Sequence, residues 1–521
     1  MKPRRPQTNT LPSSPDDLGP IDEFAPQATP GGLGRLPILV RNTSWNAASQ
    51  LLPQLTTFAV TPYLLHRIGV DRYAVWAFVA QILQVLVSLD GGLGASLMRF
   101  FAVDKATGDR TSATRLTLTA SLVLVALSAL ATLVLIVAGP VIVDHFLHLP
   151  QAERSSALLV FDEAGALVAV ALLQSVFTAL LAAHQRYRAL FAANVAGAAV
   201  YVVGVVTLVS RNGRAVDVLR SVLGQETTVT VVALVFCLSL LDWRSPTLMS
   251  WQQLRPVFAF SSKMQLAGIG GLLINNTDVF VIAALFPIRY VTYYSVAATV
   301  TTAFRALALL PVPPASVELA SAYGLGGISR AVARFRRFNR PWQHFTIGYT
   351  AVGAVATSVG VRIWLGPEYS IAAVIAGILV LGHGVNLGTA MMSALTRAIG
   401  KPGIEMRYTA ICAILNIALT PVLAVLFGIY GIEAATATAL AAGSLWFYRT
   451  LGMAVPEHDL AARVPLRLLA LAGLAAGLSA ACQWAIFTTG ITGPLAAAAA
   501  GAPAAALLGG YILIGRRVTA T

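Results

Sequence analysis

The sequence is short of charged residues. Only 11% of its 521 residues are Asp, Glu, Lys or Arg, whereas 57% are hydrophobic and the mean hydropathy is +0.74. A soluble protein of this size carries about a quarter charged residues. The shortage of charge therefore excludes a soluble globular protein and indicates that much of the surface faces lipid.

Cysteine and catalytic motifs are also scarce. The three cysteines, Cys237, Cys412 and Cys482, lie in apolar runs without metal-ligand spacing, which argues against a disulfide framework, a redox site and a metal site. The seven histidines are scattered, and no Gly-rich phosphate-binding loop is present, which disfavours direct ATP hydrolysis. We expect a protein that is not an enzyme and needs no cofactor.

Long apolar runs dominate what is present. A helix needs roughly 20 apolar residues to cross the hydrocarbon core, and unpaired backbone groups force such runs to be helical. The predicted fold class is therefore an all-α polytopic membrane protein with about fourteen transmembrane helices. The predicted spans are 43–65, 73–97, 116–143, 157–183, 189–209, 219–241, 257–285, 291–313, 342–364, 371–396, 407–427, 431–451, 466–488 and 491–514.

The loops between these spans alternate in charge. If the N-terminus is cytoplasmic, 27 of the 36 Lys and Arg residues lie on or near the inner side and eight on or near the outer side, and only Arg305 lies near the middle of a span. This bias fits the positive-inside rule with both termini in the cytoplasm. It also explains the net charge of +14 without a nucleic-acid partner, because no basic soluble domain is present.

The chain is expected to contain an internal repeat. The loop 65–76 resembles 284–294, and 175–200 resembles 392–418, so spans one to six look like a copy of spans seven to twelve. Chance similarity between apolar helices is the alternative. The predicted organisation is a Pro-rich disordered cytoplasmic tail (1–36), an N-lobe (37–245), a C-lobe (246–452), and two further spans with a short tail (453–521).

Several short motifs resemble one known family in their order and spacing. They are Arg41–Asn46, Ile68–Trp76, Leu89–Gly94 with Arg99, Gly400–Pro402 followed by Asn416, and Tyr430–Ala435. Together they resemble the polysaccharide-transport (Wzx-type) flippases of the multidrug/oligosaccharidyl-lipid/polysaccharide (MOP) exporter superfamily. The resemblance runs from about Val40 to the end of the chain. It implies two six-helix lobes in a V around a central cavity.

The resemblance also implies a function. Members of this family move undecaprenyl-pyrophosphate-linked oligosaccharides from the cytoplasmic to the outer leaflet by alternating access, for capsule, exopolysaccharide or O-antigen assembly. The partners expected are the lipid-linked oligosaccharide, membrane lipids, and polysaccharide polymerase and export machinery in a bacterial inner membrane. The alternatives are an ion-coupled multidrug or small-molecule antiporter, and an integral-membrane polymerase or ligase, which short external loops disfavour.

Ionisable residues inside spans are the first candidates for a site, because they are costly in lipid unless they pair or line a cavity. For Arg305 two interpretations stay open: a contact for pyrophosphate or a sugar carboxylate, or a structural ion pair with Asp278. Asp278 follows Asn275 and Asn276, a polar stripe that suits a cavity wall, and pairing with Arg305 is the favoured role for Asp278.

Three more residues complete the predicted site. Asp90 precedes a glycine-rich stretch and either supports a kink or couples transport to Na⁺ or H⁺. Arg41 and Lys263 lie at equivalent cytoplasmic ends of spans one and seven, where they either gather an anionic head group or act only as topogenic charges. The segment 328–340, rich in arginine, predicts an amphipathic helix lying on the cytoplasmic leaflet.

Overall fold

The structure is a computed structural model that describes residues 36–88, 93–147, 149, 151–243 and 247–454. Every regular element among these residues is a helix, and eight helices are long and apolar enough to cross a membrane. The predicted all-α polytopic membrane fold is therefore confirmed. The predicted tail, apart from its last residue, and the thirteenth and fourteenth spans lie outside the described residues.

The first eight α-helices pack mainly against one another, with α1 on α6, α4 on α5, and both α5 and α6 on α8. We call this group the first bundle. It consists of α1 (Leu36–Ile68), α2 (Val70–Ser88), α3 (Leu93–Thr107), α4 (Arg110–Val141), α5 (Gln151–Ala183), α6 (Tyr187–Gly204), the short α7 (Ser210–Asn212) and α8 (Ala215–Leu238), with π-helical turns at Ile142–Phe146 and Val205–Val209.

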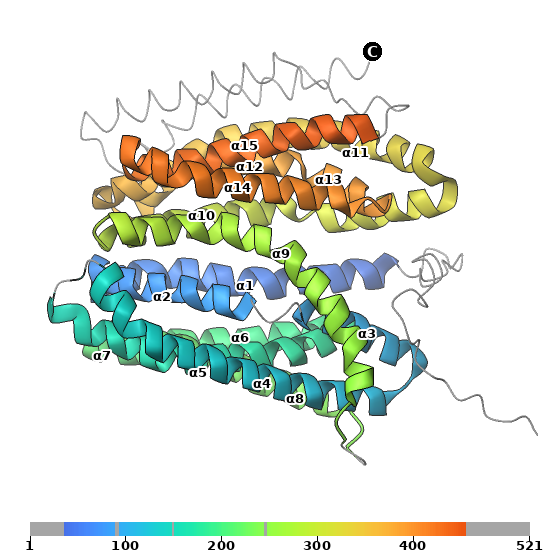
Figure 1. Cartoon of the computed structure of the whole chain (residues 1–521), viewed down its shortest axis with the longest axis horizontal. Helices are drawn as coiled ribbons and strands as arrows, with labels where there is room; N and C mark the ends of the chain where they lie inside the picture. Colours follow the sequence, from blue (N-terminus) through green and yellow to red (C-terminus); the bar gives the residue numbers. More distant parts are fainter. Residues whose placement is uncertain (1–35, 89–92, 148, 150, 244–246, 455–521) are drawn as a thin grey trace, which may run out of the picture.

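A second bundle follows, in which α14 packs on α15, α11 on α12 and α13, and α12 on both α10 and α15. Between the bundles, α9 runs obliquely from one to the other (Figure 1). These helices are α9 (Trp251–Leu285), α10 (Arg289–Leu309), α11 (Val312–Leu365), α12 (Ser370–Gly388), α13 (Ala390–Ala398), α14 (Pro402–Phe427) and α15 (Ile429–Ala454), with a 3₁₀ turn at Pro367–Tyr369.

Apolar side chains serve two purposes in this fold. Leu124 and Leu135 of α4 are fully buried between helices, whereas Leu130 and Val137 of the same helix are 57% and 65% exposed. Exposed aliphatic side chains on a helix this long would be unfavourable in water but are favourable in hydrocarbon. The composition that excluded a soluble protein is thus explained by a lipid-facing surface.

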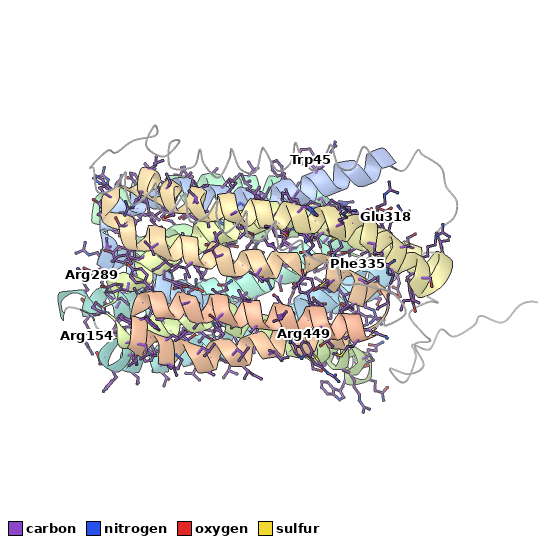
Figure 2. All side chains as sticks on the ribbon, turned by 90° about the horizontal axis from the view of Figure 1, so that it is seen from above. Trp45, Arg154, Arg289, Glu318, Phe335 and Arg449 are labelled. Atoms are coloured by element: carbon purple, nitrogen blue, oxygen red, sulfur yellow. The ribbon has the colours of Figure 1, made fainter. Side chains whose placement is uncertain are left out.

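The turns between helices gather at two opposite ends of the molecule. Arg72, after the turn at Gly69, bonds to Glu153 at 2.9 Å and to the carbonyl of Gly213 at 3.0 Å, which places three turns at one end. We call this the Gly69 end and the other the Gly108 end. Figure 2 shows Arg154 and Arg289 at the Gly69 end, with Glu318 and Phe335 towards the opposite end.

The two bundles contact each other at the Gly69 end. The hydroxyl of Thr292 on α10 donates to the carbonyl of Val70 on α2 at 2.7 Å. The rings of Phe58 on α1 and Trp364 on α11 stack with centroids 4.1 Å apart. These contacts hold the two bundles together at the Gly69 end.

The structure corrects two predictions about element boundaries. The second predicted span, 73–97, is divided between α2 and α3, with residues 89–92 outside the described residues. The predicted loop after the eighth span is helical, since α11 begins at Val312 and turns back at Gly326–Gly327, where the backbone leaves helical values.

The predicted amphipathic surface helix at 328–340 is also wrong in its placement. This segment is the start of the long second arm of α11, and its apolar face is covered by protein: Val332 and Phe335 are fully buried. Arg334 pairs with Glu318 of the first arm at 2.8 Å. Arg330, Arg337 and Arg340 remain exposed on the charged face of the predicted helix.

One pair of turns supports the internal repeat. Gln185, between α5 and α6, has a left-handed backbone with φ of 56°, and Gly400, between α13 and α14, has φ of 72°. In the two similar segments 175–200 and 392–418, each of these residues lies two positions after the end of one helix and two before the start of the next. A side chain at such a φ costs energy that glycine avoids, so Gln185 holds a turn geometry that its counterpart adopts without strain.

Candidate functional site

The predicted site residues are distributed over three helices. Asp90 lies outside the described residues, as do the side chains of Arg41 on α1 and of Lys263 and Asn275 on α9. Asn276 is buried, and its amide donates to the carbonyl of Leu272 one turn earlier at 2.9 Å.

Arg305 lies on α10, where its guanidinium has its Nε atom buried without a hydrogen-bond partner among the described residues. It lies within electrostatic range of His383 on α12 and of Tyr408 on α14. None of the ion pairs formed by the described residues includes Arg305. A guanidinium with a buried donor atom that lacks a partner has the chemistry to bind an oxyanion.

The surroundings of Arg305 are polar but carry no negative charge that the described residues reveal. His383 is 8% exposed, and its Nδ1 atom is also buried without a hydrogen-bond partner among the described residues. The amide of Asn386 donates to the hydroxyl of Tyr408. The unpartnered ring nitrogen does not fit a purely structural role for His383, in which its polar atoms would be satisfied.

The predicted ion pair between Arg305 and Asp278 is not formed among the described residues. Asp278 lies seven residues before the end of α9, and Arg305 lies sixteen residues after the start of α10. Because the two helices form a hairpin with a rise of about 1.5 Å per residue, their depths differ by roughly 13 Å. The favoured interpretation of Asp278 was therefore wrong, and its true partners come from α14 and α15.

Asp278 is the centre of a buried hydrogen-bond network. Thr436 of α15 donates to its Oδ2 at 2.7 Å, and the amide of Asn416 on α14 approaches its Oδ1 at 3.5 Å. The same amide donates to the Thr436 hydroxyl at 2.6 Å, while Thr420 donates to the Asn416 carbonyl at 2.7 Å. All four side chains are almost completely buried, and each comes from the second bundle or the half of α9 that packs against it.

Glu433 brings a second carboxylate to this network. It is 0% exposed, lies within electrostatic range of Asp278, and both of its carboxylate oxygens are buried without a partner among the described residues. The Oδ1 atom of Asn416 is unpartnered in the same way. Two neighbouring buried carboxylates cannot both stay charged without compensation, so a proton or a cation must neutralise at least one of them.

Sequence analysis overlooked Glu433 as a site residue, although a signal was present. The residue lies within the predicted span 431–451, where any ionisable group is costly. It was noted only as part of the Tyr430–Ala435 motif. Among the described residues, no group of three or more His, Cys, Asp or Glu is placed to hold a metal ion, so the network offers two carboxylates and neutral oxygens instead.

The comparisons with known proteins agree with the family suggested by the motifs. The sequence model of the family described as "Polysaccharide biosynthesis protein" matches residues 39–317, which is more than half of the chain. The chain belongs to this family. No curated protein sequence matches it.

Solved structures share the fold of this polysaccharide biosynthesis protein at low sequence identity. An inward-facing multidrug resistance MATE transporter of the MOP superfamily is 11% identical, with a TM-score of 0.65 over 81% of this chain and 96% of its own. The lipid II flippase MurJ in an inward closed conformation is 12% identical, with a TM-score of 0.63 over 92% and 100%. A MOP superfamily transporter from Pyrococcus furiosus is 14% identical, with a TM-score of 0.55 over 79% and 95%.

These similarities show that this chain has the fold of the polytopic MOP transporters. The part of the chain matched by the family model contains Asp278 and Arg305 but ends before His383, Asn416 and Glu433. The site residues on α12, α14 and α15 therefore lie outside the part of the chain that the family model matches.

Proposed function

We propose that this protein is a flippase that moves a lipid-linked oligosaccharide, carried on undecaprenyl pyrophosphate, across a bacterial inner membrane for capsule, exopolysaccharide or O-antigen assembly. The observation that carries the proposal is Arg305, a membrane-embedded guanidinium with a buried, unpartnered Nε atom. Pyrophosphate and sugar carboxylates are the anionic groups of such a cargo, and both suit bidentate binding by arginine.

The orientation proposed follows from the loop charges. The Gly108 end carries most of the Lys and Arg residues of the loops, so it faces the cytoplasm, with both chain termini on that side. The structure, whose bundles meet at the Gly69 end, then corresponds to a state closed to the outside. Cargo enters between the bundles from the cytoplasmic side and leaves after the Gly69 ends separate, which is alternating access.

The carboxylate network supplies the proposed coupling to an ion gradient. Asp278, Glu433 and the unpartnered Oδ1 of Asn416 form an oxygen-lined position that needs a positive charge. Na⁺ or H⁺ meets that need. Because Asp278 lies on α9, which contacts both bundles, neutralising this network biases how the bundles are arranged. Asp90 stays a second candidate for the same role.

The test is the loss of transport when the guanidinium is removed. Arg305→Ala is expected to abolish surface polysaccharide and to cause the lipid-linked intermediate to accumulate on the cytoplasmic side. Arg305→Lys is expected to retain part of the activity, because an ammonium keeps the charge but not the planar fork. Arg330→Ala, which removes an exposed arginine from α11, is the matched control and should behave as wild type.

One result would overturn the proposal. If Arg305→Ala protein is present in the membrane at wild-type level and the cells make wild-type amounts of polysaccharide, Arg305 does not bind the cargo. Ion-coupled antiport of a small cation is then the better candidate, because two buried carboxylates at Asp278 and Glu433 also suit a cationic substrate. The proposed partners, a polymerase and the export machinery, would then be rejected together with the flippase function.

A further inference from the structure

A cavity of about 350 Å³ lies where the two bundles meet, between α1, α10 and α11. Phe58 forms its wall on α1, Val300 and Phe304 form its wall on α10, and α11 contributes a row of residues from Tyr349 to Trp364. The stacked rings of Phe58 and Trp364 lie at its Gly69 end. Of the predicted site residues that the structure describes, none lines this cavity.

The chemistry of the wall selects an apolar ligand. The two hydroxyls in the wall are already used: Tyr349 donates to the Phe304 carbonyl at 2.9 Å, and Thr357 donates to the Gly353 carbonyl at 2.8 Å. The other lining groups are aliphatic, aromatic or glycine. Water needs two or more polar partners to occupy a cavity, so hydrocarbon is the natural occupant.

The shape of the cavity selects a long ligand. Its lining residues on α11 lie between Tyr349 and Trp364, and the fifteen helical steps from one to the other correspond to about 22 Å along the helix. That is more than half of the roughly 30 Å hydrocarbon core. Ala356 in the middle of the row is exposed, so the cavity opens sideways towards the lipid. A single hydrocarbon chain, standing parallel to the helices, fits these dimensions.

The position of the cavity indicates which hydrocarbon chain binds in it. Phe304 in the wall is adjacent in sequence to Arg305, so the deep end of the cavity and the proposed anion contact share one turn of α10. A flipped lipid must keep its tail in the membrane while its head group is held between the bundles. We propose that this cavity binds part of the polyprenyl chain of the lipid-linked cargo, an inference that rests on the proposed function.

This binding site depends on the conformation of the protein. Phe58 belongs to the first bundle and the other lining residues to the second, so the cavity is complete only while the Gly69 ends are together. A ligand that binds one arrangement better than another shifts the population towards that arrangement. Binding of the cargo's tail in this cavity therefore stabilises the state that is closed at the Gly69 end.

The test is photo-cross-linking of the full-length protein in vesicles of phosphatidylethanolamine and phosphatidylglycerol that contain radiolabelled polyprenyl phosphate. The photoreactive residue p-benzoylphenylalanine replaces Phe58 in one variant and Ile363 in another. Ile363 is half exposed on α11, near the same depth, and does not line the cavity. We expect the polyprenyl probe to be captured at position 58 and phospholipid to dominate at position 363.

A second variant fills the cavity. Gly360 lines the cavity, and a Cβ atom there would meet no heavy atom within 4 Å, so Gly360→Phe is the substitution chosen to place a ring in the cavity. Capture of the probe at position 58 should then fall by about tenfold or more, because the ring displaces several methylene groups of the ligand. Ile363→Phe is the control with the same added ring and should leave capture unchanged.

Two results would overturn the cavity assignment: capture of phospholipid alone at position 58, or undiminished capture in a folded Gly360→Phe protein. The cross-link needs no transport, so its failure is separable from that of the proposed function. No capture, together with polysaccharide loss in Arg305→Ala cells, rejects the cavity and keeps the flippase. Capture, together with normal polysaccharide in those cells, keeps the cavity and rejects the role of Arg305.

Discussion

The carboxylate of Asp71, the second residue of α2, lies 3.7 Å from the guanidinium of Arg289, the first residue of α10. The two residues follow equivalent turns in the two similar halves of the chain, and their ion pair joins the first bundle to the second. Both side chains are partly exposed, at 40% and 58%. An exposed pair of this kind contributes about 0–1 kcal/mol, enough to adjust a conformational balance but not to fix it.

Reversing one charge of this pair should loosen the contact between the bundles. We expect Asp71→Arg to increase the modification of a cysteine at the buried Thr292 by a membrane-impermeant maleimide, by roughly twofold to fivefold. The double variant Asp71→Arg with Arg289→Asp should restore the wild-type rate. Equal rates in all three proteins, on a background that lacks the native cysteines, would show that the pair does not influence the closed state.

Neutralising the buried carboxylates should abolish any stabilisation by the coupling ion. If Na⁺ binds there, wild-type protein gains about 1.4 kcal/mol at ten times the dissociation constant, compared with choline at the same ionic strength. Asp278→Asn and Glu433→Gln should lose this gain in thermal unfolding, whereas Asp162→Asn, at an exposed position on α5, should keep it. A gain that persists in both buried variants would place the ion elsewhere.

Asp104, on α3 at the Gly108 end, should make stability depend on pH. Burial raises the pKa of its carboxyl to about 6, and the neighbouring Asp109 acts in the same direction, while a hydrogen bond from Ser112 opposes them. Because the folded pKa is above the unfolded value, ionisation disfavours the folded state, and stability falls as the pH rises from about 4 to 6.

Asp104→Asn removes this penalty. The variant should therefore melt at a higher temperature than wild type at pH 8 and at nearly the same temperature at pH 4, in detergent at constant ionic strength. Asp162→Asn, which changes an exposed carboxylate on α5, is the control. A difference between Asp104→Asn and wild type that is the same at both pH values would exclude titration of Asp104 as its cause.

The two similar turns should respond in opposite ways to an exchange of residues. Gly400→Gln places a side chain at a φ of 72° and should lower the free energy of unfolding by about 1 kcal/mol. No atom lies within 4 Å of the added Cβ, so the cost is conformational rather than steric. Gln185→Gly should be neutral or slightly stabilising. A loss of stability in Gln185→Gly would mean that its side chain makes a contact of its own.

Two glycines on α11 offer a matched comparison of packing. A Cβ at Gly353 would lie 2.1 Å from Cε2 of the Phe304 ring, whereas one at Gly360 meets nothing within 4 Å. Gly353→Ala should cost about 1–3 kcal/mol, because Phe304 must move from its stack on Tyr349. Gly360→Ala should gain up to about 1 kcal/mol of helix propensity. Similar melting temperatures for both variants would contradict this packing.

Much of the fold could be predicted from the sequence because its signals are local. Apolar runs were enough to locate most of the spans up to 451, although not the second, and short motifs identified the family. What failed depended on context. The segment around Glu318 and Arg334 is too polar for a span, yet it forms helix because its two arms pack on each other. The hydrophobic periodicity and the polarity of the segment do not by themselves reveal that one arm of α11 packs against the other.

The sequence was enough to predict that Arg305 and Asp278 belong to a site, but not which residues each of them contacts. Arg305 and Asp278 stood out because each is ionisable within an apolar run, which is a property of one position. Their separation depends on how far each lies from the turn between α9 and α10, and the predicted boundaries were too coarse to measure it. The approach of Asp278 to Thr436 and Glu433 joins positions more than 150 residues apart, for which the sequence holds no local signal.

The connection between the bundles restricts where the molecule can bend. The segment between α8 and α9 is bonded to the first bundle. The hydroxyl of Thr114 on α4 accepts from the backbone N–H of Asp242 at 2.8 Å, and that of Thr119 accepts from the backbone N–H of Met249 at 2.9 Å. Ser261 on α9 extends this attachment by bonding to Ser96 at 2.5 Å. Gln265 on α9 also donates to the carbonyl of Ser88 on α2 at 3.0 Å. Any swing of one bundle against the other must therefore be absorbed inside α9, beyond Gln265 and before Asp278, which makes a helix, rather than the loop ahead of it, the pivot of the protein.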